Sequence, residues 1–201
     1  MTTEDTRSAI LKCARKLFYS EGYEASSIQS ILKELNIARG TLYYHFESKE
    51  AILDAILEEK GEFFLSKAKE VAADKSLPAD QRLIRTLLAL KHSSPVNEDE
   101  IESTHKPHNA LMHQKSNRLI VELAGPLLME IVADGVKERI FNCPFPDEVV
   151  EMILIYVNVG FDYLEGQAPE TIQRKLQGFV YIVHHLLGAE PGSLDFTPLF
   201  A

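Results

Sequence analysis

Apolar side chains recur along this chain with the period of an α-helix. Between residues 10 and 18, and again between 28 and 35, they stand three and four positions apart, which places them on one face of a helix. No strand-like alternation extends beyond a few residues, and no internal repeat is present. The pattern therefore predicts an all-α chain of about nine helices. Beyond the first two, helices are expected over 39–45, 48 into the seventies, 78–90, 107–125, 127–140, 147–165 and 169–188.

The ends of several helices are marked by residues with special backbone preferences. Gly22 is expected to end the first helix and Asn36 the second, because both residues tolerate the left-handed backbone of a helix C-terminus. Ser26 and Gln29 have the spacing of a capping box and predict the start of the second helix. The pair Gly125-Pro126 is expected to break a later helix and to send the chain in a new direction.

Length and composition describe an ordinary folded chain. The 201 residues are 45% hydrophobic and 25% charged, which is enough apolar material for a buried core. No apolar run reaches the roughly 18 residues of a membrane helix, and no secretory signal is visible at the N-terminus. Cys13 and Cys143 form no CxxC pair, so neither a disulfide framework nor a zinc motif is expected. The cytoplasm is the expected compartment, with no membrane partner and no cofactor.

Charge is distributed unevenly along the chain. The net charge of −9 argues against nucleic acid at first, but residues 1–50 contain seven basic and seven acidic side chains and are neutral. The whole excess therefore belongs to residues 51–201. Because an acidic body repels DNA, a DNA contact is expected only at the N-terminal end. The natural domain boundary lies near residue 50, inside the long fourth helix, so we predict domains over 1–50 and 51–201 and assign any DNA contact to the first.

Residues 26–45 are the most informative part of the sequence. Two short helices with a tight connection are typical of a helix-turn-helix. On the second of them, Leu42 and Phe46 lie four residues apart and are expected to point inward. The outer face then carries Arg39, Gly40, Thr41, Tyr43, Tyr44 and His45. Such a face suits phosphate and base-edge contacts in a major groove, although a half-buried aromatic helix explains these residues equally well.

The order of these residues resembles a known family. The signature of the TetR family of transcriptional regulators is similar to the run Gly40-Thr41-Leu42-Tyr43-Tyr44-His45-Phe46, followed by Ser48-Lys49-Glu50 and an apolar helix. Gly22-Tyr23 and Ser26-Ser27-Ile28 stand where that family ends its first helix and starts its second. The resemblance covers about residues 5–60, and the rest of the chain matches mainly in length and helical character.

The resemblance implies a role for each matching residue. Ser26 and Ser27 would cap the second helix and touch a phosphate, and Lys49 would bind another phosphate as a mobile charge. Ala38 stands where the family often has Ser or Thr, so one cap or phosphate contact is expected to be missing. Leu42 and Phe46 would be core residues. Groove-facing positions would be Arg39, Gly40, Thr41 and Tyr44, while Tyr43 and His45 would hold the DNA backbone.

Two helices in the second domain are apolar on nearly every side. Twelve of the 16 residues over 149–164 are apolar, and the segment 172–187 is similar. Such helices must be covered on two sides, either within one subunit or across a four-helix interface between two subunits. The family resemblance favours the homodimer. The predicted interface residues are Val157, Phe161, Phe179 and Val183.

An effector site is expected among the middle helices, where apolar walls would meet a few polar groups. The candidate residues are Leu88, His92, His108, Met112 and Tyr156. Four histidines, His92, His105, His108 and His113, also stand near an acidic loop and leave a metal site open. Their spacing fits no familiar metal motif, and surface or capping positions explain them as well.

The resemblance implies a dimeric DNA-binding repressor that a small-molecule effector releases from a palindromic operator in double-stranded DNA. An enzyme is not expected, because the sequence has no nucleophile elbow, no Gly-rich phosphate loop and no HExxH run. Two alternatives stay open: a metal-dependent enzyme or metal sensor that uses the histidines, and a helical adaptor that has lost DNA binding.

Overall fold

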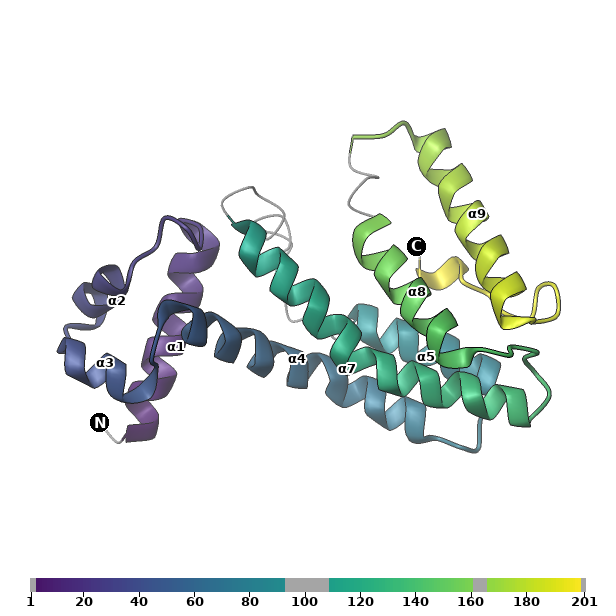
Figure 1. Cartoon of the computed structure of the whole chain (residues 1–201), viewed down its shortest axis with the longest axis horizontal. Coiled ribbons are helices and arrows are strands. Elements are labelled where there is room, and N and C mark those ends of the chain that lie inside the picture. Colours follow the sequence, from purple (N-terminus) through teal and green to yellow (C-terminus); the bar gives the residue numbers. More distant parts are fainter. Residues whose placement is uncertain (1–2, 93–108, 161–165, 200–201) are drawn as a thin grey trace. The chain divides into compact units, whose positions relative to one another are not determined.

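The computed structural model describes residues 3–92, 109–160 and 166–199 (Figure 1). Its elements are the α-helices α1 (Thr3–Ser20), α2 (Ile28–Leu35), α3 (Arg39–His45), α4 (Lys49–Ala73), α5 (Ala79–His92), α7 (Ala110–Lys137), α8 (Pro146–Gly160) and α9 (Pro169–Leu187), and the 3-10 helix η3 (Thr197–Leu199). Within these described ranges every regular element is a helix, which confirms the predicted all-α class.

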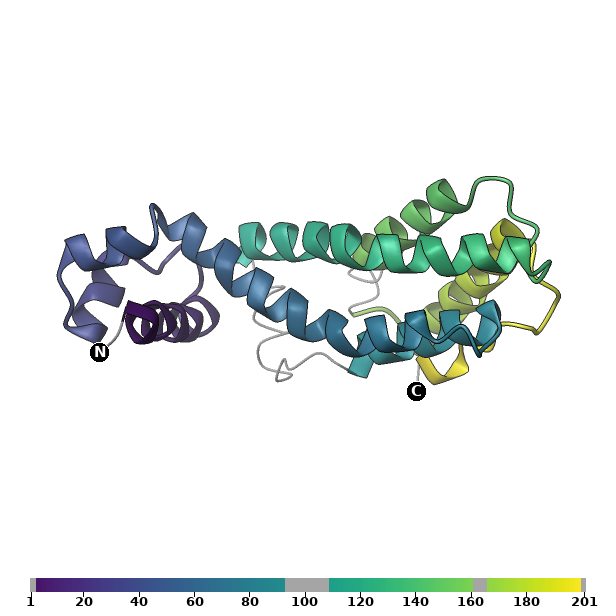
Figure 2. The ribbon, with the colours of Figure 1, turned by 90° about the horizontal axis from the view of Figure 1, so that it is seen from below.

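The chain divides into two compact units. Unit 1 contains residues 1–62 and 95–119, and unit 2 contains residues 63–94 and 120–201. Both α4 and α7 supply residues to each unit (Figures 1 and 2). Unit 1 is therefore larger than the domain predicted over 1–50, because it extends along α4 and takes in the first turns of α7.

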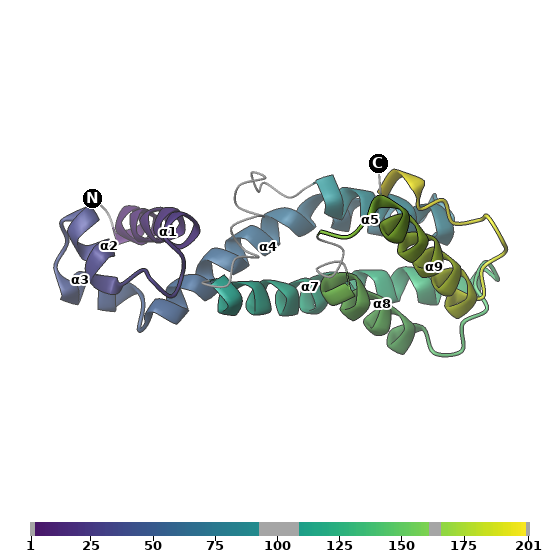
Figure 3. The same cartoon turned by 90° about the horizontal axis from the view of Figure 1, so that it is seen from above.

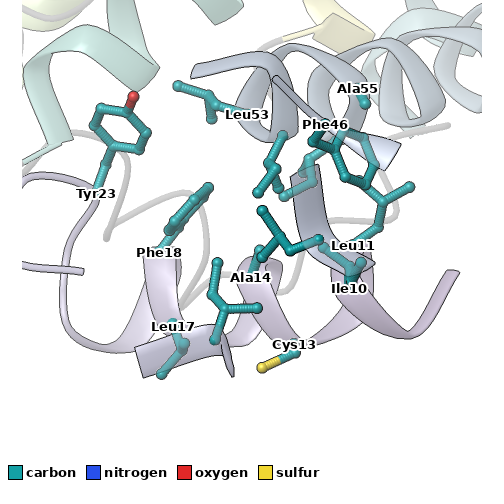
Figure 4. Close-up of a cluster of buried hydrophobic side chains, with 14 of the residues drawn as sticks. Ile10, Leu11, Cys13, Ala14, Leu17, Phe18, Tyr23, Phe46, Leu53 and Ala55 are labelled. Carbon is teal, nitrogen blue, oxygen red and sulfur yellow. The ribbon is translucent and has the colours of Figure 1, made fainter. Parts of the chain in front are cut away.

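The core of unit 1 forms around the apolar face of α1. Ile10, Ala14 and Phe18 have no exposed surface, as their three- and four-residue spacing predicts. Phe46, which follows α3, and Leu53 of α4 point into the same cluster (Figure 4). Burial of each large side chain in such a cluster contributes about 1.5–3 kcal/mol, so α1 organises the packing of the helices that follow it.

The turns before α2 and α3 follow the sequence closely. Gly22 has a φ of 98° and Asn36 a φ of 50°, both in the left-handed region, which confirms the predicted helix ends. The N-cap of α2 is Ser27, whose Oγ accepts the Ser30 N–H at 3.0 Å. The capping box predicted at Ser26 is wrong, because that hydroxyl is buried and donates to the Gly22 carbonyl at 2.7 Å.

Helix α7 continues without a break through Gly125 and Pro126, so the predicted break is wrong. A proline inside a helix costs about 3 kcal/mol, because it removes a backbone hydrogen bond and crowds the preceding turn. Buried side chains on both sides, Ala124 and Leu128, offset that cost by packing. Gly125 lies beside α8: an added Cβ would be in ordinary van der Waals contact with Leu154 Cδ1, at 3.7 Å.

The core of unit 2 combines side chains from α4, α5, α7, α8 and α9. Figure 3 shows the course of these helices. Ile131 of α7, Val150 of α8 and Val183 of α9 are among its buried members. The segment after α9 belongs to the same core, because Leu194 and Phe196 are buried in it. The chain therefore closes this core with residues that follow its last long helix.

A network of charged side chains lies inside unit 2. Arg82 of α5 has no exposed surface, and its Nη2 donates to Asp134 Oδ2 at 2.8 Å. Its Nη1 donates to the Ala72 carbonyl at 3.2 Å. Lys75 donates to the same aspartate and to Glu130. The hydrogen bonds from Lys75 and Arg82 hold the pKa of the Asp134 carboxyl well below its ordinary value.

Replacing Asp134 with alanine is expected to lower the free energy of unfolding by about 3 kcal/mol, because it leaves the buried Arg82 with only the longer ion pair to Glu138, at 3.8 Å. Glu130→Gln, at an exposed ion pair, should cost less than about 1 kcal/mol. The pKa of Asp134 is depressed in the folded state, so its contribution is present above the unfolded-state pKa of about 4 and is lost as the pH falls below it. Urea unfolding at pH 7 and pH 3 measures both effects. Equal costs for the two variants at pH 7 would contradict this account.

Candidate nucleic-acid interface

The helix-turn-helix predicted over residues 26–45 is formed by α2, α3 and the turn at Asn36. In α2, Ile31 is fully buried and Leu32 nearly so, which fixes this helix on the core of unit 1. In α3, Leu42 has no exposed surface, and Phe46 directly after it is 5% exposed. The prediction that these two side chains anchor the short helix is confirmed.

The outer face of α3 presents aromatic and basic side chains. Tyr44 is 77% exposed and Tyr43 is 41% exposed. The Arg39 guanidinium lies 5.3 Å from the centre of the Tyr43 ring, and its Nη2 donates to the Tyr43 hydroxyl at 3.4 Å. The Tyr44 ring meets the His45 ring edge to face, with 5.1 Å between the centres. Arg39 and Tyr43 therefore support each other, while Tyr44 is the more accessible of the two tyrosines.

Gly40 gives the same face an open position. It is exposed, and an added Cβ would meet no atom of the protein within 4 Å. The fold therefore does not require a glycine here, and the missing side chain leaves room for close approach from outside. Thr41, the next residue, is half-buried at the edge of the face.

The N-terminus of α3 has no side-chain cap. Its N-cap residue, Ala38, adopts an extended backbone and makes no side-chain hydrogen bond to the helix. This confirms the expectation of a missing cap, for which Ser or Thr would supply an oxygen. The structure therefore leaves the first N–H groups of α3 without that intramolecular acceptor.

The two serines before α2 are placed differently from each other. Ser27 is exposed and its hydroxyl is shared with the Ser30 N–H and the Ser30 hydroxyl. Ser26 is only 3% exposed, and its hydroxyl bonds the Gly22 carbonyl. Ser26 therefore has little surface to present to a phosphate, whereas Ser27 lies at the surface.

Lys49 is held inside unit 1 instead of extending freely into solvent. Its Nζ donates to the Tyr23 carbonyl at 2.8 Å and to the Ser26 carbonyl at 3.0 Å. It also lies 4.2 Å from the centre of the Tyr23 ring. The prediction of a mobile charge is corrected: this ammonium joins the start of α4 to the segment before α2. An ammonium has three N–H donors, so one remains beyond these two carbonyls.

The predicted effector residues do not come together in one unit. Leu88 of α5 is half-buried and Tyr156 of α8 is 49% exposed, and both belong to unit 2. Met112 is 1% exposed and packs in the core of unit 1, so its side chain is committed to that core. The side chain of His92, and all of His108, lie outside the described residues.

The predicted dimer residues are placed mostly inside the subunit. Phe179 is 9% exposed and Val183 is 2% exposed, and both pack in the core of unit 2. Val157 is half-buried against the same core, and Phe161 lies outside the described residues. The interface predicted at Phe179 and Val183 is therefore corrected to intramolecular packing.

The sequence analysis missed an exposed apolar stripe on α8 and α9. We name this set the α8–α9 stripe: Met152, Ile155, Tyr156, Tyr181 and Ile182, which are 49–64% exposed. Their spacing of three, four or one residue was visible in the sequence. What the sequence could not show is which face of each helix is covered within the subunit.

The histidine cluster is only partly described. The side chain of His113 is half-buried, and its Nε2 lies 3.1 Å from Asn117 Nδ2 in a hydrogen bond. His105 lies outside the described residues. Among the described residues no group of three or more potential ligands could hold a metal ion. No described helix is long and apolar enough to cross a membrane.

Models of one protein family match two parts of this chain. Residues 10–56 match the model described as "Bacterial regulatory proteins, tetR family". Residues 92–182 match the model described as "Tetracyclin repressor-like, C-terminal domain". The first match contains α2 and α3 with the outer face described above.

Individual relatives agree with this match. The chain is 28% identical over 137 residues to the HTH-type transcriptional regulator UidR of Escherichia coli, covering 66% of this chain and 69% of UidR. It is 26% identical over 190 residues to the uncharacterized HTH-type transcriptional regulator YhgD of Bacillus subtilis, covering 88% and 95%. The crystal structure of RolR in complex with resorcinol has the same fold, with a TM-score of 0.64 and 20% identity over 94% of this chain and 90% of RolR.

Replacing Lys49 with methionine is expected to lower the free energy of unfolding by about 1–3 kcal/mol, because the Tyr23 and Ser26 carbonyls lose a charged donor. Lys33→Met, on the exposed surface of α2, should change it by no more than about 0.5 kcal/mol. Chemical denaturation of both variants, with hydrogen exchange of the amides in residues 10–56, measures the difference. A Lys49→Met protein as stable as the parent would show that this contact does not form in solution.

Proposed function

The chain belongs to the TetR family of bacterial transcriptional regulators and carries its DNA-binding domain, and from this premise we propose a dimeric repressor that a small organic effector releases from its operator. The outer face of α3 carries the proposal. It combines an exposed Tyr44, a supported Arg39 and an open Gly40 on a helix anchored by Leu42. Accessible donors on a rigid helix are what major-groove recognition requires.

The proposed contacts follow from the placement of each side chain. Arg39 and Tyr44 read base edges, and Gly40 lets the backbone of α3 come close to the groove. Tyr43, His45 and the exposed Ser27 hold phosphates beside it. Lys49 contributes at most its remaining N–H. The proposed DNA contacts are thus Ser27, Arg39, Gly40, Thr41, Tyr43, Tyr44 and His45, with Lys49 limited to that one N–H and Ser26 left out of the predicted set.

The α8–α9 stripe supports the proposed homodimer. Met152, Ile155 and Tyr156 lie within five residues of α8, and Tyr181 and Ile182 are adjacent on α9. An apolar surface of this kind is costly to leave in water, and a second copy of the chain would cover it. A two-fold dimer places two copies of α3 on two half-sites, so the operator is expected to be palindromic.

Unit 2 is the proposed place for the effector. It contains Leu88, and its core is built from α4, α5, α7, α8 and α9, while Tyr156 belongs to the α8–α9 stripe. RolR, which shares the fold, was crystallised with resorcinol, and this supports a small organic molecule as the class of effector. Binding would favour a conformation of the dimer that fits the operator poorly, a population shift. We further propose that the protein works in the cytoplasm, where it meets DNA, and catalyses no reaction.

Tyr44→Ala is expected to weaken specific operator binding by about 1–3 kcal/mol, because a side chain of α3 that is 77% exposed is lost. Gly40→Ala should also weaken binding, while stabilising α3 by up to about 1 kcal/mol, since alanine is the better helix former. The control is Phe145→Ala, which removes an aromatic side chain that is 64% exposed in unit 2.

The measurement begins with genomic fragments selected by the effector-free parent, which also reveal the operator. Affinities for the selected fragment and for competitor DNA then compare the three variants at fixed salt. If Tyr44→Ala and Gly40→Ala both bind like the parent, α3 is not the helix that reads DNA.

Ile182→Asp is expected to convert the dimer to a folded monomer, because it places a charge in the proposed interface without disturbing the subunit core. Phe145→Asp makes the same change at an exposed position outside the α8–α9 stripe and should leave the dimer intact. Light scattering gives the mass, and circular dichroism confirms that the helices persist. A parent that is monomeric at micromolar concentration rules out this interface.

A further inference from the structure

The first turns of α7 are built into unit 1. Met112 is 1% exposed and belongs to the same core cluster as Phe18, and Leu111 and Leu119 pack against that cluster. In the sequence, all of α5 lies between α4 and this part of α7. Unit 1 therefore acquires part of its core from residues that lie beyond the family match over 10–56.

A buried hydrogen bond joins the start of α7 to the segment before α2. Asn109, one residue before α7, has no exposed surface, and its Oδ1 accepts the Tyr23 N–H at 2.6 Å. The carbonyl of the same Tyr23 accepts from Lys49, which also bonds the Ser26 carbonyl. Ser26 precedes the N-cap of α2. A continuous set of hydrogen bonds therefore leads from Asn109 to the start of the helix-turn-helix.

An ion-pair bridge joins the next turn of α7 to the start of α4. Lys115 Nζ lies 2.8 Å from Glu50 Oε1 and 2.7 Å from Asp54 Oδ1. The two carboxylates stand four residues apart on α4, where like charges repel each other unless a cation compensates them. Hydrogen bonds to Asp54 and Glu50 raise the pKa of the Lys115 ammonium, so it stays charged over the physiological range.

We propose that Asn109 and Lys115 are positioning residues for DNA binding, which fix the segment Tyr23–Ser26 and the start of α4 so that α2 and α3 keep the orientation that fits the groove. Neither residue is part of the outer face of α3. The proposal rests on the operator binding proposed above. It adds the start of α7, which is distant in sequence from α2 and α3, to the residues that determine operator affinity.

Hydrogen exchange of the DNA-free, full-length protein tests the contacts first. Asn109→Leu keeps the branching and the number of side-chain heavy atoms and lacks the acceptor, so exchange of the Tyr23 amide should become faster by roughly tenfold. Amides in the core of unit 2, such as that of Ile131, should not change. The control is Thr86→Val, which replaces a buried hydroxyl that has no hydrogen-bond partner within the described part of the chain. Unchanged exchange at Tyr23 in Asn109→Leu would overturn the proposal.

Operator affinity tests the consequence. Asn109→Leu and Lys115→Gln should each weaken specific binding by about 2- to 30-fold, the range found for residues that act through others. Lys115→Arg should retain most of the affinity, because a guanidinium can reach both carboxylates. Lys16→Gln is the matched control: it removes an equal charge and an ion pair with Glu34, at 3.3 Å, which joins α1 and α2 within the same unit.

A double variant separates positioning from simple repulsion of DNA. Lys115→Gln combined with Asp54→Asn restores the net charge of the site but not the bridge. If positioning matters, the double variant stays as weak as Lys115→Gln, and recovery to the affinity of the parent would overturn the proposal. Faster exchange at Tyr23 with unchanged operator affinity would also overturn it. A parent that selects no genomic fragment would refute the proposed function instead, and it would overturn this proposal with it.

Discussion

The seven residues of α3 depend for their helical shape on the burial of Leu42. Isolated helices shorter than about 12 residues are marginal in water, because forming the first turn is unfavourable. α3 also lacks a side-chain cap, since Ala38 offers no oxygen. Its outer face is therefore maintained by tertiary packing, in which Leu42 and Phe46 join the core of unit 1. Every contact that α3 could make with DNA depends on the integrity of that core.

Local features of the fold were predictable because they depend on near neighbours in the chain. The apolar periods of α1 and α2, and the left-handed residues Gly22 and Asn36, are decided within a few residues. The errors arose where distant packing decides. Two adjacent serines can each cap a helix, and only the burial of Ser26 assigns the cap to Ser27. At Gly125-Pro126 a strong local signal for a break was overcome by packing on both sides.

The candidate site was predicted in outline and misjudged in detail for the same reason. The TetR-like run identified the outer face of α3, but not the two carbonyls that hold Lys49. On α9, Phe179 and Val183 are inside while Tyr181 and Ile182 are outside. All four are apolar in the sequence. Because each residue of a helix is rotated by about 100° from the one before it, residues one or two positions apart face different sides of the helix. Only the packing of α8 and α9 within the subunit decides which pair is left for a partner.

Helix α7 contributes side chains to the cores of both units. It carries Met112 in the core of unit 1 and Ile131 in the core of unit 2, with continuous helical structure between them. Close-packed cores resist small displacements of the side chains inside them. The covalent continuity of α7, together with that of α4, therefore joins side chains fixed in the core of unit 1 to side chains fixed in the core of unit 2.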